Sequence, residues 1–148
     1  GRHEFVAQFP SVATMQELLA APEDRATFEA CKLDWSERER NAHVVALHRD
    51  LIALRRELPR EIRAAVLTDD ALVIRWTAAP HLLVLNLGRD LAFDPAPEPL
   101  LAPPAGCARW EIAWSSEWPQ YGGSGTPELD TEDGWKVPGG CAVLLRPV

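Results

Sequence analysis

The feature that most constrains the fold is a change in the spacing of apolar residues at Pro59. From about Ser36 to Leu58, apolar side chains recur every three or four residues, which is typical of one face of an α-helix. Ser36 and Glu39 have the spacing of a capping box, and Pro59 cannot continue a helix. After Pro59 the period falls to about two, in short runs rich in β-branched and aromatic residues. We therefore expect a helical segment followed by an all-β part.

The apolar stripe of the expected helix over residues 36–58 is wide enough to face a core. Glu37 and Glu39 in its first turn and Arg55 and Arg56 in its last turn match the helix macrodipole. Such a surface needs a partner, either the β part or a second chain, and an uncovered stripe favours self-association through the helix face. The stripe consists of Val44, Leu47, Leu51, Leu54 and Leu58, widened by Val45 and Ile52.

Shorter helical segments are expected upstream. Thr14 and Glu17 repeat the capping spacing ahead of Met15, Leu18 and Leu19, and Pro22 ends that segment. A second short turn is expected over residues 24–30.

The β part is expected to contain six or seven short antiparallel strands. Asp69 and Asp70 form a tight hairpin candidate, and the Pro-rich stretch over residues 94–104 must cross the surface as a loop because proline removes ladder donors. The expected fold class is α+β, with an N-terminal helical segment over residues 1–60 and an antiparallel Greek-key β-sandwich over residues 61–148. The strand patterns cover residues 64–68, 71–77, 81–87, 108–115, 135–137 and 142–146.

Charge and composition exclude some classes of function. Asp and Glu number 22 against 15 Lys and Arg, and a net charge of −7 argues against nucleic acid as a partner. No apolar run approaches the length of a membrane span, so we expect no membrane partner. Cys31, Cys107 and Cys141 are widely spaced and odd in number, which we interpret as reduced thiols in a cytoplasmic protein.

The usual signatures of metal and phosphate sites are missing from the sequence. Four histidines offer no pair three or four residues apart, so we expect no metal site and no cofactor. The glycine-rich stretch over residues 122–125 has no lysine at a P-loop position, and a turn with positive φ angles explains it better. The acidic pairs at 69–70 and 132–133 fall at expected turns, so we assign them no chemistry.

Aromatic residues gather in the last third of the chain, where rings on a β-sandwich could stack on sugars. Trp110 and Trp114 share one parity with Ile112, so core packing accounts for both rings. Trp118 and Tyr121 fall in the following loop and are the better candidates for exposure and for sugar binding.

Four stretches of the chain carry a family resemblance. They are residues 1–5, residues 28–37 with the block Lys-Leu-Asp-Trp-Ser-Glu, residues 47–56, and residues 114–117 with Tyr-Gly-Gly at 121–123. They resemble the maltooligosyltrehalose trehalohydrolases of the α-amylase group of glycoside hydrolases, and the last two are also similar to glycogen branching enzymes. The resemblance implies a (β/α)8 catalytic barrel followed by a small antiparallel β domain, with residues 36–58 as the last barrel helix.

In such a barrel, residues 1–35 would connect the last strand to the last helix and lie on the active-site face. The resemblance therefore implies that five residues of this connection lie near bound oligosaccharide. They are Arg2, Glu4, Phe5, Asp34 and Trp35.

The family's catalytic Asp, Glu and Asp lie on earlier barrel strands, and none of those motifs occurs in this sequence. The resemblance thus implies a C-terminal accessory region, inactive alone, of a retaining enzyme that hydrolyses the α-1,4 bond beside a terminal trehalose unit. Its partners would be the rest of the barrel and, through the parent enzyme, α-glucan or maltooligosyltrehalose. The alternative is a free-standing carbohydrate-binding or protein-interaction module that uses Trp118 and Tyr121.

Overall fold

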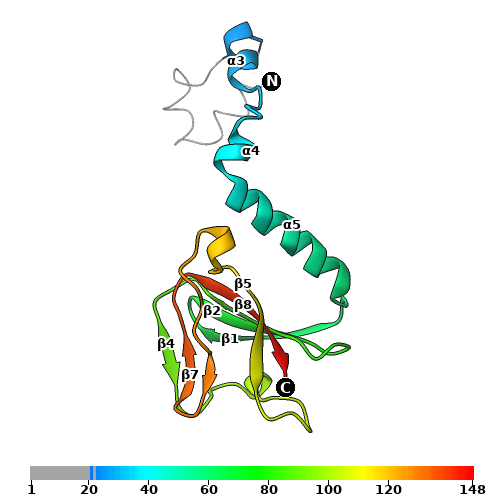
Figure 1. Cartoon of the computed structure of the whole chain (residues 1–148), viewed down its shortest axis with the longest axis vertical. Helices are drawn as coiled ribbons and strands as arrows, with labels where there is room; N and C mark the ends of the chain where they lie inside the picture. Colours follow the sequence, from blue (N-terminus) through cyan, green and yellow to red (C-terminus); the bar gives the residue numbers. More distant parts are fainter. Residues whose placement is uncertain (1–20, 22) are drawn as a thin grey trace, which may run out of the picture. The chain divides into compact units, whose positions relative to one another are not determined.

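The computed structural model describes Ala21 and residues 23–148 (Figure 1). The chain divides into two compact units, Gly1–Arg40 and Asn41–Val148. The domain boundary predicted after residue 60 stays a prediction. The short helix predicted around Thr14 to Leu19 lies outside the described residues.

Two short helices are described in the first unit. Helix α3 (Arg25–Ala30) lies at the turn predicted for residues 24–30, and the Asp24 side chain caps it by accepting from the Ala26 N–H. Helix α4 (Glu37–Arg40) is a single turn. The prediction of one continuous helix from Ser36 to Leu58 is wrong, because Asn41 has φ −108° and ψ 34°, outside the helical region. The Ser36 hydroxyl donates to Asp34, and the Glu39 N–H bonds to the backbone carbonyl of Ser36 rather than to its hydroxyl, so the predicted capping box is not formed.

Helix α5 (Ala42–Glu57) opens the second unit and carries the predicted apolar stripe. It ends where the sequence predicted, because the Leu58 N–H makes the last bond, to the Leu54 carbonyl, and Leu58 is already extended before Pro59. Only part of the stripe is covered. Leu47, Leu54 and Leu58 pack against the β domain, whereas 40% of Leu51 remains exposed.

The β domain contains two antiparallel sheets, which confirms the α+β fold with a sandwich-like β part. The larger sheet has the strand order β1-β2-β3-β8-β5 and the smaller one β4-β7-β6. Two strands were missed, because β4 and β6 are too short for a period of two to show. The strands are β1 (Ile62–Thr68), β2 (Ala71–Trp76), β3 (Leu82–Asn86), β4 (Leu91–Phe93), β5 (Trp110–Ser115), β6 (Asp130–Thr131), β7 (Gly134–Val137) and β8 (Cys141–Pro147).

Both faces of the larger sheet are apolar, and each carries its own cluster. The inter-sheet core lies on one face and contains Val73, Leu82, Val84, Leu101, Trp110, Leu129, Trp135, Val137, Cys141, Val143 and Leu145. The helix-side cluster lies on the other face and contains Trp114, Tyr121 and Leu144, with Ala46, Leu47, Leu54, Leu58, Trp76, Leu83, Trp118 and Ala142 packed against them.

Both tryptophans of β5 are buried in apolar clusters, as predicted, but they lie on different faces of the larger sheet. Ile112 pairs with Leu145, but Trp114 pairs with Leu144, so the register shifts by one residue between them. An extra residue in one strand turns the following side chains to the other face. Trp110 therefore belongs to the inter-sheet core and Trp114 to the helix-side cluster.

The Pro-rich stretch crosses outside both sheets, as predicted, and contains the 3-10 turn η2 (Pro99–Leu101). Side chains of the larger sheet hold it in place. Arg75 donates to the Leu100 and Ala102 carbonyls at 3.0 and 2.6 Å, and the Trp110 indole N–H donates to the Leu101 carbonyl at 2.7 Å. The loop makes no β-ladder hydrogen bonds, but these side chains give its backbone carbonyls hydrogen-bond partners.

Candidate functional site: the helix-side face of the larger sheet

A hydrogen-bond network joins α5 to the loop after β5. The Tyr121 hydroxyl, on the 3-10 turn η3 (Pro119–Tyr121), donates to Asp50 Oδ2 at 2.5 Å and accepts from Trp114 Nε1 at 3.1 Å. Gln120 Nε2 donates to the same Asp50 oxygen at 3.3 Å. Burial, and then the bond to Asp50, raise the pKa of Tyr121 above its usual value. The phenol therefore stays protonated and acts as the donor.

The aromatic side chains of this loop pack against neighbouring rings. Tyr121 is only 8% exposed, so the prediction that it is an exposed ring is wrong. Its ring lies 6.3 Å from that of Trp118, nearly parallel, and 6.0 Å from that of Trp114 at 44°. Its hydroxyl needs buried partners, and α5 and β5 supply them. Trp118 is half-buried, and sugar binding by either residue stays a prediction.

The glycine-rich stretch is the turn that the sequence predicted. Gly122 has φ +90° and Gly125 has φ +98°, where side chains are disfavoured. At Gly123 a Cβ atom would lie 2.2 Å from the carbonyl oxygen of Glu117, so only glycine fits. These glycines let the chain fold back closely enough for η3 to reach α5.

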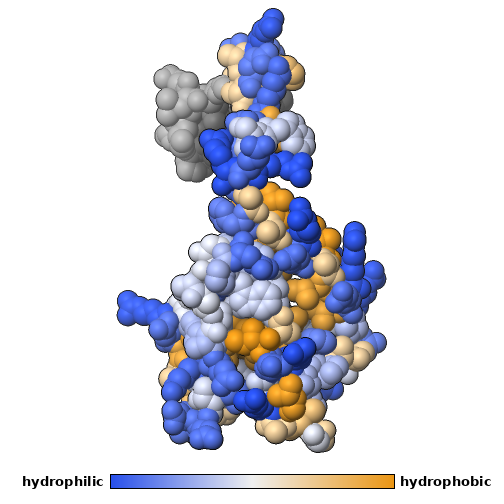
Figure 2. Space-filling view, viewed as in Figure 1, coloured by the Kyte–Doolittle hydropathy of each residue, from blue (hydrophilic) through white to orange (hydrophobic). Residues whose placement is uncertain are grey.

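An open groove runs beside this network, between α5 and the larger sheet. Its volume is about 870 Å³, and its lining is mainly apolar but includes Arg55, Arg56 and Arg60. Leu51 and Ile52 line it and remain 40% and 53% exposed. Figure 2 shows apolar surface along α5 next to charged side chains. The remaining residues of the groove are Leu54, Leu58, Pro59, Trp76, Leu83, Trp114 and Leu144.

The predicted substrate contacts of the first unit are partly described. Asp34 accepts from the hydroxyl and the N–H of Ser36 and pairs with Arg40 at 3.3 Å. The two bonds from Ser36, the side-chain one first, lower the pKa of Asp34. Trp35 is 68% exposed, with the Arg38 guanidinium 5.8 Å from its ring.

Three of the predicted substrate contacts, Arg2, Glu4 and Phe5, lie outside the described residues. The roles predicted for Asp34 and Trp35 stay predictions. Across Ala21 and residues 23–148, no three His, Cys, Asp or Glu side chains gather as a metal site would need. No helix in that part of the chain is long and apolar enough to span a membrane.

Comparison of the sequence with known proteins assigns the chain to a family. Residues 59–145, from just after α5 to the last strand, match the family described as Domain of unknown function (DUF3459). The chain belongs to this family. A 67-residue stretch is 42% identical to the malto-oligosyltrehalose trehalohydrolase of Arthrobacter ramosus, which confirms the resemblance predicted from the sequence. The stretch covers 44% of this chain but 12% of that relative, and no solved structure matches the chain.

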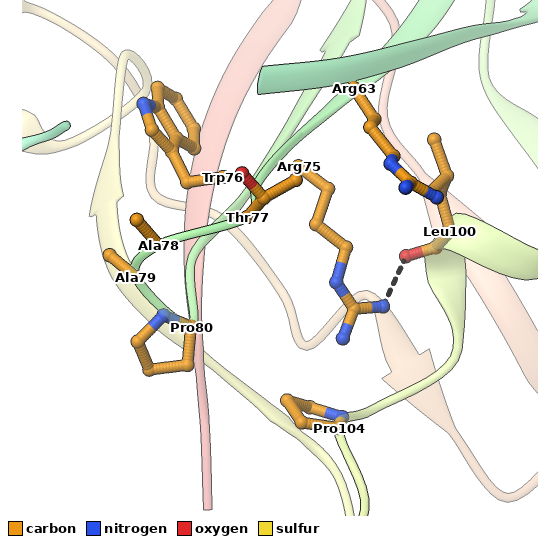
Figure 3. Close-up of a pocket in the computed structure, with 9 residues that line it drawn as sticks. All are labelled: Arg63, Arg75, Trp76, Thr77, Ala78, Ala79, Pro80, Leu100 and Pro104. Carbon is orange, nitrogen blue, oxygen red and sulfur yellow. Dashed lines mark hydrogen bonds between the residues drawn. The ribbon is translucent and has the colours of Figure 1, made fainter. Parts of the chain in front are cut away.

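The DUF3459 region also holds two arginines that the sequence reasoning missed. Arg63 on β1 and Arg75 on β2 are direct partners in the ladder, and both line a 500 Å³ pocket (Figure 3). The rest of the pocket comes from the turn after β2 and from the Pro-rich loop. These residues are Trp76, Thr77, Ala78, Ala79, Pro80, Leu100 and Pro104.

Proposed function

We propose that this chain is the C-terminal accessory region of a retaining glycoside hydrolase that releases trehalose from maltooligosyltrehalose by α-1,4 hydrolysis. The 42% identity to a trehalohydrolase supports the proposal. The catalytic carboxylates would come from the parent's barrel, so the chain by itself would be inactive. A cytoplasmic location is part of the proposal, and the three unpaired cysteines support it.

The observation that carries the proposal is that α5 is apolar on two sides. Leu47 and Leu54 pack on the larger sheet, while Leu51 and Ile52, which line the open groove beside that contact, remain 40% and 53% exposed. A helix that packs on one layer and leaves a second apolar side open has the pattern of an element between two layers. We propose that the catalytic barrel covers this second side and that the β domain holds α5 against it.

Ile52→Glu tests this role, with Ala53→Glu as the matched control on an exposed position of the same helix. In the 148-residue chain neither change should alter stability by more than about 0.5 kcal/mol, because both positions are exposed. In the full-length parent enzyme, Ile52→Glu would bury a charge at the barrel contact and should lower both trehalose release and the melting temperature. Equal behaviour of the two variants in the parent would contradict the proposal.

A second candidate is a carbohydrate-binding module, favoured by Trp118, which is only partly buried and stacks on Tyr121. Titration of the chain with maltooligosaccharides, followed by tryptophan fluorescence, tests it. A saturable change that Trp118→Ala abolishes would support a sugar platform. A flat signal up to millimolar sugar would remove it.

A further inference from the structure

We propose that Arg63 and Arg75 form a binding site for a phosphate group, carried by a small molecule or free in solution. This site is separate from the helix-side face, because both residues have the parity of Val73 and Ala65, which belong to or pack on the inter-sheet core. The inference does not depend on the proposed hydrolase function.

Two positive charges meet across the β1–β2 ladder. Arg63 and Arg75 lie directly opposite each other on neighbouring strands, an arrangement that costs free energy unless an anion lies between the charges. In the part of the chain that the structure describes, no carboxylate oxygen lies within 4.0 Å of either guanidinium.

One of the two guanidiniums, that of Arg75, is already fixed in place. The Nη1 atom of Arg75 donates to the Leu100 and Ala102 carbonyls, and its guanidinium lies 5.4 Å from the centre of the Trp110 ring. These contacts hold the plane of the group, so little side-chain entropy would be lost on binding an anion. In Figure 3 both guanidiniums extend toward Leu100 at one side of the pocket.

The shape and chemistry of the pocket fit a phosphate ester or free phosphate. Two guanidiniums that line one pocket supply a +2 charge and several N–H donors, which suit a dianion with tetrahedral oxygens. A volume of about 500 Å³ is larger than a bare ion needs and falls in the range of small-molecule sites. Pro80, Leu100 and Pro104 give apolar walls on which the carbon skeleton of a phosphate ester could rest.

The test is calorimetric titration of the 148-residue chain with inorganic phosphate, glucose 6-phosphate, glucose and acetate in low salt. Phosphate should bind with a dissociation constant in the millimolar range or below and raise the melting temperature. Tighter binding of glucose 6-phosphate would identify a phosphate ester as the ligand, and equal binding would identify free phosphate. Acetate as strong as phosphate, or no heat with any anion at 10 mM, would overturn the proposal.

Arg63→Gln separates the site from general electrostatic attraction. Arg63 is exposed, so the variant should fold, which circular dichroism can verify. It should weaken phosphate binding about tenfold, because one charge-assisted pair is lost. Arg89→Gln removes the same charge at an exposed position outside the pocket and should leave the affinity within about twofold. Equal loss in both variants would show unspecific attraction and overturn the site.

Discussion

The Tyr121 hydroxyl holds α5 to the β domain, and Tyr121→Phe removes that hydroxyl while keeping the ring. A hydrogen bond to a charged group contributes about 1.5 to 3 kcal/mol, and a buried donor left without a partner costs about 1 to 3 kcal/mol. Asp50 keeps its hydrogen bond from Gln120 and is half-buried, so a water molecule can partly replace the hydrogen bond that the Tyr121 hydroxyl donated. Trp114 is 5% exposed, so its indole N–H loses its partner in a buried place. We expect a net loss of about 2 kcal/mol.

For a folding unit of about 100 residues, this loss corresponds to a melting temperature about 8 °C lower. Urea unfolding followed by tryptophan fluorescence gives the free energy directly. Asp50→Asn and the double variant complete a thermodynamic cycle, in which the two changes should couple by about 1 kcal/mol or more. Asp133→Asn is the control, because Asp133 and Lys136 form an exposed ion pair at 3.2 Å whose loss should cost less than about 0.5 kcal/mol.

Alkaline pH gives an independent measure of the same bond. Because the pKa of Tyr121 is raised in the folded protein, its stabilising contribution is complete below the unfolded pKa of about 10 and is lost as the pH rises through the folded value. The stability difference between the wild type and Tyr121→Phe should therefore shrink above pH 10. Tyr121 is the single tyrosine of the chain, so its ionisation can be followed by absorbance. A melting temperature within 1 °C of the wild type at pH 7, or additive changes in the cycle, would refute the reasoning.

Three further outcomes are expected. Leu54→Ala should cost about 2 kcal/mol in urea unfolding because Leu54 packs on the helix-side cluster, and Leu51→Ala less than about 1 kcal/mol because Leu51 is 40% exposed; equal costs would contradict the packing. Gly123→Ala should unfold more easily than the wild type by several kcal/mol, since its Cβ would meet backbone at 2.2 Å. Burial raises the pKa of Cys141 to about 11, so with a thiol reagent at pH 8 exposed Cys31 should react and Cys141 only after unfolding.

The elements that the sequence predicted best are those that a local signal controls. Pro59 ends α5, the Asp69-Asp70 pair turns the first hairpin, and the Pro-rich loop stays outside the sheets. In each case the residue acts through its own backbone, so no information about distant parts of the chain is needed. The helix break at Asn41 is different. Asn41 is a common N-cap residue, but its side chain makes no cap bond and it stands inside a continuous apolar pattern, so it was not recognised as a break.

The candidate site was less predictable because it depends on contacts across the chain. Tyr121 and Asp50 are 71 residues apart, and nothing local to the Tyr-Gly-Gly block indicates that its hydroxyl will meet a carboxylate on α5. An aromatic residue in a loop therefore suggested exposure, and the structure buries it. Trp118 in the same loop is only partly buried, so loop position predicts exposure only where no buried partner is within reach.

Two β-bulges determine which side chains share a face, and both lie outside what a period of two can predict. A regular hairpin that pairs Thr68 with Ala71 would pair Arg63 with Trp76, but the register shift between Val66 and Thr68 pairs Arg63 with Arg75 instead. The shift in β5 likewise turns Trp114 away from Trp110 and toward the helix side. The same kind of irregularity thus places the paired arginines on one face of the larger sheet and supplies the indole N–H to the Tyr121 network on the other. Removing either bulge should turn the side chains on one side of it to the opposite face, and should therefore disturb the packing on both faces of the larger sheet.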